Sequence, residues 1–308
     1  MMHLIDDEID FSKYMDLTEH DASVRSASSY IDDVIAHFHD DNEPRGVKTP
    51  WQKVGALVRF RKSEVTIWTG YNGHGKSLVL GMVTLGFVAQ GQRVCIASME
   101  MLPKITLSRM ARQAFVTSKP DAEDIRDLYQ STGEHVWLYD QQGMVNSDKI
   151  VGVANYAARK LKCDHFIIDS MLKCGLAEDD YGGQKHLVDK LCTVARDTGI
   201  HIHLVAHSRK GKDETAIPGK MDVRGAASIT DQADNVISTW RNKAKELAIS
   251  EGNGHQVVND PDALLDVCKQ RNGEWEGRIK LWFDAASLQF VESSNGGTRN
   301  ILNPRHYQ

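Results

Sequence analysis

One short glycine-rich stretch constrains the fold of this chain more than any other feature. Residues 70–77 read GYNGHGKS and satisfy the pattern GxxxxGK(S/T); the strand-like run EVTIWT precedes them and the helical run SLVLGMVTLGFVAQ follows. Glycines let backbone N–H groups turn inward around phosphate oxygens, and a helix N-terminus adds partial positive charge. A chance glycine-rich turn is the weaker interpretation. The predicted nucleotide-binding residues are Gly70, Tyr71, Asn72, Gly73, His74, Gly75, Lys76 and Ser77, with Lys76 on the β- and γ-phosphates and Ser77 on Mg²⁺.

Apolar runs alternate with helix-like stretches through the main part of the chain. Strands are expected at Val65–Thr69, Val94–Ser98, Val136–Tyr139, His165–Asp169, Ile200–Ala206, Asn235–Trp240, Ala263–Lys269 and Ile279–Asp284. Helices are expected at Ser77–Gln90, Lys104–Thr117, Ser147–Lys160 and Lys185–Thr198. This alternation predicts an α/β fold whose mostly parallel sheet is covered on both faces. The closely spaced runs of the last third predict antiparallel strands at one end of the sheet.

Two acidic residues follow predicted strands and are candidates for the chemistry on the phosphates. Asp169 follows the apolar run Phe166–Ile168, where a carboxylate that holds Mg²⁺ is expected. Glu100 ends the strand after the phosphate-binding loop helix, so it would meet the nucleotide at the carboxyl ends of the strands. There it could act as the base that activates water. The alternatives are a turn-capping aspartate and a surface glutamate before Pro103.

Further motifs occur in a fixed order between about Trp51 and Phe290. They are GYNGHGKS, SMEM, FIIDS, HLVAHS, DVRGAASITDQADNVI and KQRNG. Together they resemble the DnaB-type hexameric replicative helicases, including bacteriophage primase-helicases and Twinkle-like enzymes. The resemblance implies a RecA-like P-loop NTPase in which Glu100 activates water, Asp169 holds Mg²⁺ and His207 senses the γ-phosphate. Many relatives carry glutamine at the position of His207, and phage relatives carry histidine.

The motif KQRNG places two cations on one predicted strand. Lys269 and Arg271 are two residues apart, so both side chains would point to the same side. The resemblance implies that they reach the site of the neighbouring subunit, where an arginine finger neutralises charge on the transferring phosphoryl group. A solvated basic hairpin is the alternative, because Asn272–Gly273 is itself a turn signal.

A basic segment directly follows the predicted sensor strand. Its cations are Arg209, Lys210, Lys212, Lys220 and Arg224, and they are the predicted DNA-contacting residues. Such contacts would be ionic and insensitive to sequence. Arg224 would either meet DNA or support the loop. A solvated loop without function is the alternative for this basic segment. Residues 174–183 are acidic and glycine-rich and are a weaker candidate, for a second channel loop that offers backbone amides to phosphate.

The residues before the motor predict a linker. Residues 28–40 place apolar side chains at helical spacing, and the segment 42–50, with two prolines and a glycine, predicts a boundary near Trp51. We therefore expect an acidic segment and linker helix over 1–50, the motor domain over 51–292 and a C-terminal tail over 293–308. The linker helix would dock on the adjacent subunit of a ring or pack within its own chain.

Composition restricts the location and the partners. Five cysteines form no CxxC pair, no apolar run approaches the roughly 20 residues of a membrane span, and the N-terminus is acidic. These features predict a cytoplasmic protein without a membrane partner. The resemblance adds ATP or another NTP or dNTP with Mg²⁺, single-stranded DNA, 5′→3′ travel and a homo-hexamer or heptamer. We also expect a separate primase, polymerase or loader and a phage or plasmid source in a bacterial host.

Three other interpretations stay open on the sequence. A RecA- or RadA-like recombinase or a clock-type ring ATPase would share the nucleotide site without unwinding DNA; the KQRNG and DVRGAAS segments disfavour it. A non-enzymatic assembly or adaptor module would bind nucleotide without turnover; Glu100 and Arg271 disfavour it. A packaging motor is disfavoured because no nuclease-like carboxylate cluster is visible.

Overall fold

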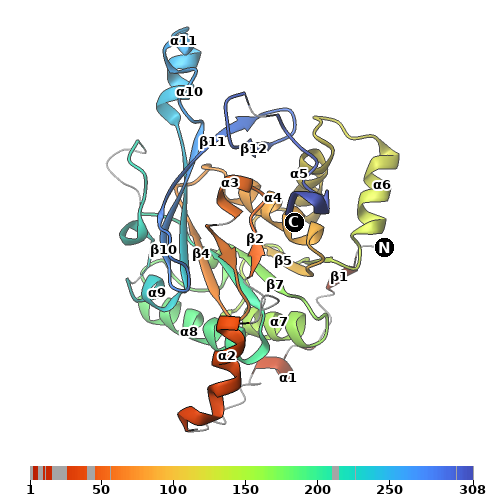
Figure 1. Cartoon of the computed structure of the whole chain (residues 1–308), viewed down its shortest axis with the longest axis vertical. Coiled ribbons are helices and arrows are strands. Elements are labelled where there is room, and N and C mark those ends of the chain that lie inside the picture. Colours follow the sequence, from red (N-terminus) through yellow and green to blue (C-terminus); the bar gives the residue numbers. More distant parts are fainter. Residues whose placement is uncertain are drawn as a thin grey trace.

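The described part of the chain is built on one large sheet. The computed structural model describes residues 3–5, 10, 12–15, 26–39, 46–55, 57–209, 215–225, 227–295 and 297–307. The sheet has ten strands in the order β1-β6-β5-β7-β8-β4-β9-β10-β11-β12, and β2 and β3 form a separate pair (Figure 1). The strands are β1 His3–Ile5, β2 Val47–Lys48, β3 Arg59–Phe60, β4 Val65–Thr69, β5 Val94–Ser98, β6 Val136–Tyr139, β7 His165–Asp169, β8 His201–Val205, β9 Asn235–Arg241, β10 Ala263–Gln270, β11 Gly277–Asp284 and β12 Gln289–Val291.

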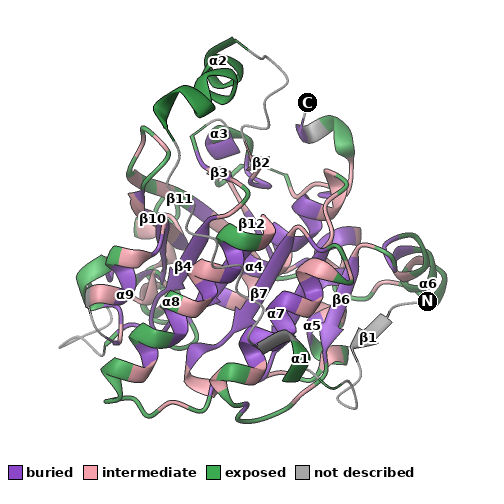
Figure 2. Cartoon of the chain, turned by 90° about the horizontal axis from the view of Figure 1, so that it is seen from below, coloured by how far each residue is buried: buried purple, intermediate pink, exposed green. Residues whose placement is uncertain are grey.

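Helices cover both faces of the sheet. They are α1 Ser12–Met15, α2 Ile31–His39, α3 Gln52–Gly55, α4 Lys76–Ala89, α5 Pro103–Phe115, α6 Ala122–Ser131, α7 Ser147–Arg159, α8 Tyr181–Thr198, α9 Ala227–Gln232, α10 Lys243–Ser250 and α11 Gly254–Val257. The apolar residues of α7, α8 and α9 form one buried cluster with the sheet, and those of α3, α4 and α5 form a second (Figure 2). Among the described residues, no helix is long and apolar enough to span a membrane.

Strand burial explains the sheet topology. The neighbours from β1 to β9 in the sheet order run parallel, and β4, β5, β7 and β8 are buried along their whole length. Strands covered on both faces are expected to be apolar throughout. Strands β10 and β11 alternate between more and less buried residues and pair antiparallel, as do β11 and β12. The predicted α/β architecture, with a mostly parallel sheet and antiparallel strands toward the C-terminus, is confirmed.

Several elements differ from the sequence expectation. Helix α6 was missed although Ile125, Leu128 and Tyr129 have helical spacing; it is short, buries only Leu128, and its start is capped by Asp121. Helix α8 begins four residues earlier than Lys185, since Asp180 caps a first turn that contains two glycines. Helices α10 and α11, inserted between β9 and β10, were missed as well. They project from the body at the end opposite α2 (Figure 1).

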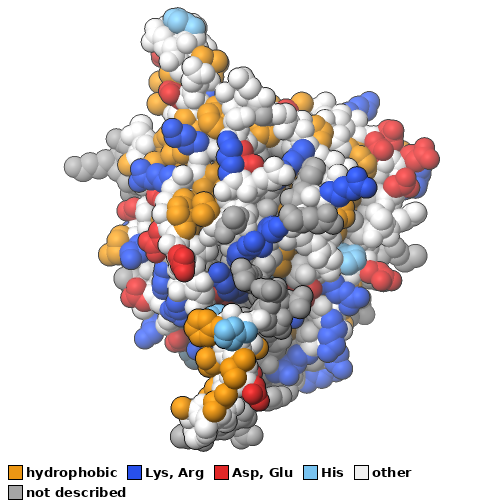
Figure 3. Space-filling model, in the orientation of Figure 1, with side chains coloured by type: hydrophobic (Ala, Val, Ile, Leu, Met, Phe, Trp, Pro, Cys, Tyr) orange, Lys and Arg blue, Asp and Glu red, His pale blue; other side chains and the backbone are white. Residues whose placement is uncertain are grey.

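The expected linker helix is present as a 3-10 turn, Ala27–Tyr30, followed by α2. None of the residues of α2 is buried, and four apolar side chains are exposed on it, Ile31, Val34, Ile35 and Phe38. The helix stands away from the sheet and its helices, and its apolar side chains are visible in the space-filling view (Figure 3).

Three histidines are buried together beneath the sheet surface. The Trp68 indole N–H donates to Nδ1 of His203 at 3.1 Å, and the His203 and His165 rings are hydrogen-bonded at 3.2 Å. His201 lies between the Arg61 carbonyl and the Thr66 hydroxyl. Burial lowers the pKa of all three imidazoles, that of His165 and His203 well below the usual range. Because Nδ1 of His203 accepts a hydrogen bond, its Nε2 carries the proton and donates to His165.

Candidate nucleotide-binding site

The phosphate-binding loop starts where the central strand β4 ends. Gly70 has φ 140°, and a Cβ atom there would lie 2.3 Å from the Thr239 carbonyl oxygen. Gly75 has φ 86° at the N-cap of α4, and its Cβ would lie 3.0 Å from the Phe290 ring. Residues other than glycine rarely adopt these backbone angles, and at both positions a Cβ atom would press against its neighbour. The two glycines therefore allow the loop to close around the N-terminus of α4.

Lys76 and Ser77 occupy the first turn of α4. The Lys76 ammonium donates to the carbonyls of Gly70 and Tyr71, both at 2.9 Å, so it lies inside the loop. Burial lowers its pKa to about 8, although the nearby carboxylates of Asp169 and Glu100 favour its charge. The Ser77 hydroxyl donates to Asp169 Oδ2 at 2.6 Å. The loop thus presents one cation and one hydroxyl to a phosphate chain.

The two candidate carboxylates lie together because β5 and β7 are adjacent. Ser98 of β5 is in register with Asp169 of β7, so the segments that follow the two strands lie side by side. The Ser170 hydroxyl donates to Glu100 Oε1 at 2.7 Å. The imidazole of His207 and the Ser170 hydroxyl lower the pKa of Glu100 to about 2, against the effect of burial. Burial raises the pKa of Asp169, a desolvation cost that a bound cation would offset.

His207 lies two residues beyond the end of β8 and faces the same carboxylate. Its Nε2 is 3.7 Å from Glu100 Oε1, which is an ion-pair distance and longer than a direct hydrogen bond. Its Nδ1 is buried and has no hydrogen-bond partner among the described residues. Its carbonyl accepts from the Arg224 N–H at 2.7 Å. The ring therefore has one buried nitrogen without a partner among the described residues, its other nitrogen faces Glu100, and its backbone is hydrogen-bonded to the basic loop.

These groups surround a cavity of about 570 Å³. Five residues of the loop line it, Asn72, Gly73, Gly75, Lys76 and Ser77, together with Glu100, Asp169 and His207. The sequence interpretation missed Arg109 and Lys173, which also line it. Arg109 is nine residues after Glu100 on α5, and a cation at that distance from a strand-end carboxylate is the signal that could have revealed it.

A second cavity adjoins the same loop, and Gly73, Gly75 and Leu78 line both cavities. It is about 180 Å³ in volume and is lined by His74, Arg241, Phe283 and Phe290, among others. His74 packs edge-on against Tyr71 and accepts from the Arg241 N–H at 3.0 Å. These two loop residues thus shape the second cavity. Nothing in the sequence pattern singled out Arg241, Phe283 or Phe290, since they come from three separate strands.

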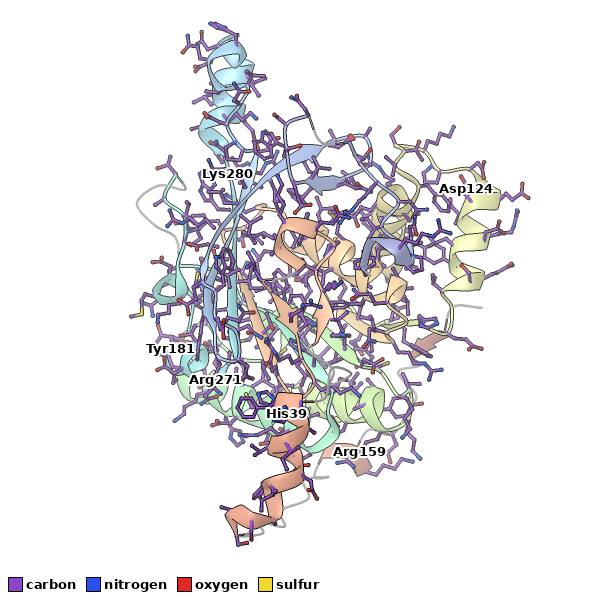
Figure 4. All side chains as sticks on the ribbon, in the orientation of Figure 1. His39, Asp124, Arg159, Tyr181, Arg271 and Lys280 are labelled. Atoms are coloured by element: carbon purple, nitrogen blue, oxygen red, sulfur yellow. The ribbon has the colours of Figure 1, made fainter. Side chains whose placement is uncertain are left out.

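Lys269 and Arg271 lie at the other edge of the sheet. Strand β10 runs antiparallel to β9, so Gln270 is in register with Asn235, which pairs with Thr66 near the start of β4. The five residues of β4 span roughly 16 Å at about 3.3 Å per residue. This is farther than either side chain reaches, so in one chain the pair does not meet its own phosphate-binding loop. Figure 4 shows Arg271 at the end of the β10–β11 hairpin away from α10.

The predicted DNA-contacting residues are only partly described. Lys210 and Lys212 lie outside the described residues. Arg209 and Lys220 are exposed, and Arg209 donates to the Gly225 carbonyl at 3.1 Å. Arg224 pairs with Glu178 at 2.6 Å, and so joins the basic loop to the acidic segment 174–183. Residues 181–183 of that segment are the first turn of α8.

A comparison with known protein families matches residues 46–292 to the family described as DnaB-like helicase C terminal domain. The match covers most of the chain. The chain belongs to this family. The DnaB-like motor is therefore a helicase domain that hydrolyses nucleoside triphosphates, which confirms the resemblance drawn from the ordered motifs.

Two solved structures share the fold. One, described as an ATPase domain, has a TM-score of 0.71 at 16% identity and covers 88% of this chain and 99% of its own. The other, "The Structure Of A DnaB-Like Replicative Helicase And Its Interactions With Primase", has a TM-score of 0.66 at 15% identity and covers 87% of this chain and 67% of its own. At these identities the likeness concerns the architecture of the DnaB-like motor.

Proposed function

We propose that this chain is the motor of a ring that translocates on single-stranded DNA, 5′→3′, and unwinds duplex. The observation that carries the proposal is the position of Lys269 and Arg271 at the opposite edge of the sheet from the phosphate-binding loop. These cations lie away from the phosphate-binding loop of their own chain, whereas copies arranged head to tail would supply Arg271, and the charge of Lys269, to one another. Head-to-tail contacts close into a ring when the rotation between copies closes and give a helical filament when it does not. A hexamer, or a heptamer, is the proposed assembly.

The donor set around the cavity fits an ATP–Mg²⁺ complex. Ser77 and Asp169 already share a hydrogen bond, so their two oxygens converge on one point, and Mg²⁺ commonly takes one or two protein oxygens together with phosphates and water. When bound, the ion would neutralise charge on the phosphates. Glu100 orients and deprotonates the attacking water, while Lys76 and Arg109 hold phosphate oxygens from the same chain. Arg271 of the next copy completes the neutralisation.

The base of the nucleotide is proposed to occupy the second cavity. This cavity lies beside the same loop, and Phe283 and Phe290 provide apolar rings for a planar base. Such contacts accept several bases, because every base has a flat face that can stack and stacking distinguishes poorly between bases. We therefore propose ATP with tolerance for other NTPs or dNTPs.

The exposed stripe of α2 is proposed to hold the ring together. Ile31, Val34 and Ile35 are 54%, 52% and 52% exposed and Phe38 is 75% exposed, which leaves an apolar face without cover from the described part of its own chain. Large exposed apolar patches mark interaction sites in soluble proteins. A second copy of this chain is the proposed occupant.

The basic loop is proposed to grip the DNA backbone. Its two arms meet at the bridge between Ser208 and Val223, directly beside His207. A change of phosphate state at His207 would therefore shift Arg209 and Lys220 with the loop. Lys210 and Lys212 stay predicted contacts. The contacts to phosphates would be ionic and would weaken with salt.

The test is steady-state ATP hydrolysis with and without single-stranded DNA. Wild type, Glu100→Gln, Arg271→Ala and a mixture of these two inactive variants are compared. Arg278→Ala is the matched control, since this arginine also forms an ion pair on the antiparallel part of the sheet, with Asp266 at 3.2 Å. We expect DNA to stimulate the wild type and the control, and mixing to restore part of the activity. Turnover that ignores DNA, with no rescue on mixing, would favour a self-contained ATPase or an assembly module.

The cellular setting rests on the sequence. A cytoplasmic location, a phage or plasmid source, and a separate primase, polymerase or loader stay predictions. One of the similar solved structures is described as interacting with primase, which makes a primase the first partner to test.

A further inference from the structure

The segment Asp231–Asp234 joins α9 to β9 and contacts both cations of the KQRNG motif. The Lys269 ammonium donates to the carbonyls of Thr230, Asp231 and Ala233 at 2.9, 2.9 and 2.7 Å. All three of its N–H groups are thus used at the carboxyl end of α9, where the helix dipole favours a cation. Lys269 is therefore held by backbone alone.

Arg271 is held differently, because its main partner is a carboxylate. Its Nη1 donates to Asp234 Oδ1 at 2.9 Å, and its Nη2 donates to the carbonyls of Asp231 and Gln232 at 2.9 and 3.3 Å. The guanidinium is fixed along this edge, yet the side chain is still 48% exposed, so the remainder is open to a second molecule. The arrangement orients the cation and leaves it accessible.

Asp234 is itself fixed on its other side. Its Oδ2 accepts from the Val65 N–H at 2.9 Å, and its own N–H donates to the Val65 carbonyl at 2.9 Å. Its side chain is only 14% exposed. The carboxylate therefore has a single position, between the first residue of β4 and the Arg271 guanidinium. The β-bulge between Val267 and Lys269 sets where β10 presents Arg271 to it.

We propose that Asp234 is a positioning residue for Arg271, which it orients for use in the nucleotide site of the next copy. This inference rests on the proposed inter-subunit site. Arginine is long and flexible, and a charge-assisted hydrogen bond to a fixed carboxylate limits the rotamers that it samples. Asp234 acts without touching the nucleotide of either site.

The variant Asp234→Asn tests the role, because an amide oxygen can still accept from Val65 while the charge on Arg271 loses its partner. We expect turnover in the presence of single-stranded DNA to fall about tenfold, with KM for ATP unchanged. The matched control is Asp231→Asn, since the Asp231 carbonyl, which this substitution leaves in place, is the group that accepts from Arg271. The control is expected to keep wild-type turnover.

Mixing experiments separate positioning from damage to strand β4. If Asp234 acts through Arg271, an Asp234→Asn subunit has an intact site and a misplaced finger. Mixing it with Glu100→Gln would then restore activity, and mixing it with Arg271→Ala would not. Damage to its own site would give the reverse pattern and overturn the proposal. The double variant Asp234→Asn/Arg271→Ala should turn over no more slowly than Arg271→Ala alone.

The controls distinguish a failure of the role given to Asp234 from a failure of the proposed function. If Glu100→Gln and Arg271→Ala fail to rescue each other, the inter-subunit site itself is wrong. If they rescue each other and Asp234→Asn follows the reverse pattern, only the role of Asp234 is wrong. Should Asp234→Asn not assemble by gel filtration, Asp234→Glu takes its place, because it keeps the charge, moves the carboxylate and predicts the same mixing pattern.

Discussion

Lowering the pH should destabilise this motor through its three buried histidines, even without nucleotide. His165, His201 and His203 are neutral in the folded chain because burial lowers the pKa of each. In the unfolded chain they regain a pKa of about 6.5. The unfolded state therefore binds more protons as the pH falls. The stability that the neutral rings contribute is complete above the unfolded pKa and is lost below it.

The size of the effect follows from the number of rings. Each histidine that is neutral when folded and protonated when unfolded costs about 1.4 kcal/mol of unfolding free energy between pH 7.5 and 5.5. His165 and His203 together give a loss of about 3 kcal/mol, a large part of a typical domain stability of about 5–15 kcal/mol, and His201 adds to it in the same direction. His203→Gln isolates one ring, because glutamine can accept from Trp68 and donate to His165 as the imidazole does.

Urea unfolding at pH 7.5 and 5.5, followed by circular dichroism, measures this loss. We expect His203→Gln to reduce the difference between the two pH values by about 1.4 kcal/mol, whatever its stability at pH 7.5. His37→Gln is the control, since His37 is exposed on α2. An unchanged difference in His203→Gln, or an equal reduction in the control, would refute the assignment of the pH effect to the buried cluster.

Four further predictions concern the nucleotide and DNA contacts. Gly75→Ala should weaken nucleotide binding more than tenfold, because φ 86° and the Phe290 ring exclude a Cβ; equilibrium binding of labelled ATP measures it. Phe283→Ala should raise KM for ATP with little change in kcat, and an unchanged KM would place the base elsewhere. Ser170→Ala should lower kcat, because Glu100 Oε1 loses the hydroxyl that donates to it at 2.7 Å; steady-state ATP hydrolysis measures it. Arg209→Ala should lower affinity for all single strands alike and reduce the salt slope by about 0.7–1, measured by fluorescence anisotropy.

The sequence predicts the fold well wherever periodicity is strong. The buried strands of the parallel sheet are rich in apolar and β-branched residues, and the bounds of β4, β5 and β7 agree with the sequence expectation to the residue. Helix α6 is short, and its helical spacing rests on three residues, Ile125, Leu128 and Tyr129, of which Leu128 alone is buried. Residues whose main interaction is a cap, such as Asp121, show little pattern of their own.

The same contrast between strong and weak sequence signals holds for the residues of the candidate site. Glu100, Asp169 and His207 follow strands, so their meeting at one edge of the sheet follows from topology once the strands are parallel. Arg241 and Phe283 meet across separate strands, and only the register of those strands places them beside the loop. The role of Asp234 was equally hidden, since it depends on a contact between residues 37 positions apart.

The two ends of strand β4 contact different functional groups. One end carries the phosphate-binding loop, and the other is hydrogen-bonded to the residue that holds Arg271. A strand paired on both sides does not stretch, so in a closed ring each copy would behave as a stiff lever between two successive nucleotides. A displacement at one phosphate would reach the next site through the body of a single copy. The order in which the sites hydrolyse nucleotide would then follow from the geometry of the sheet, and no further structural element would be needed to transmit the change between subunits.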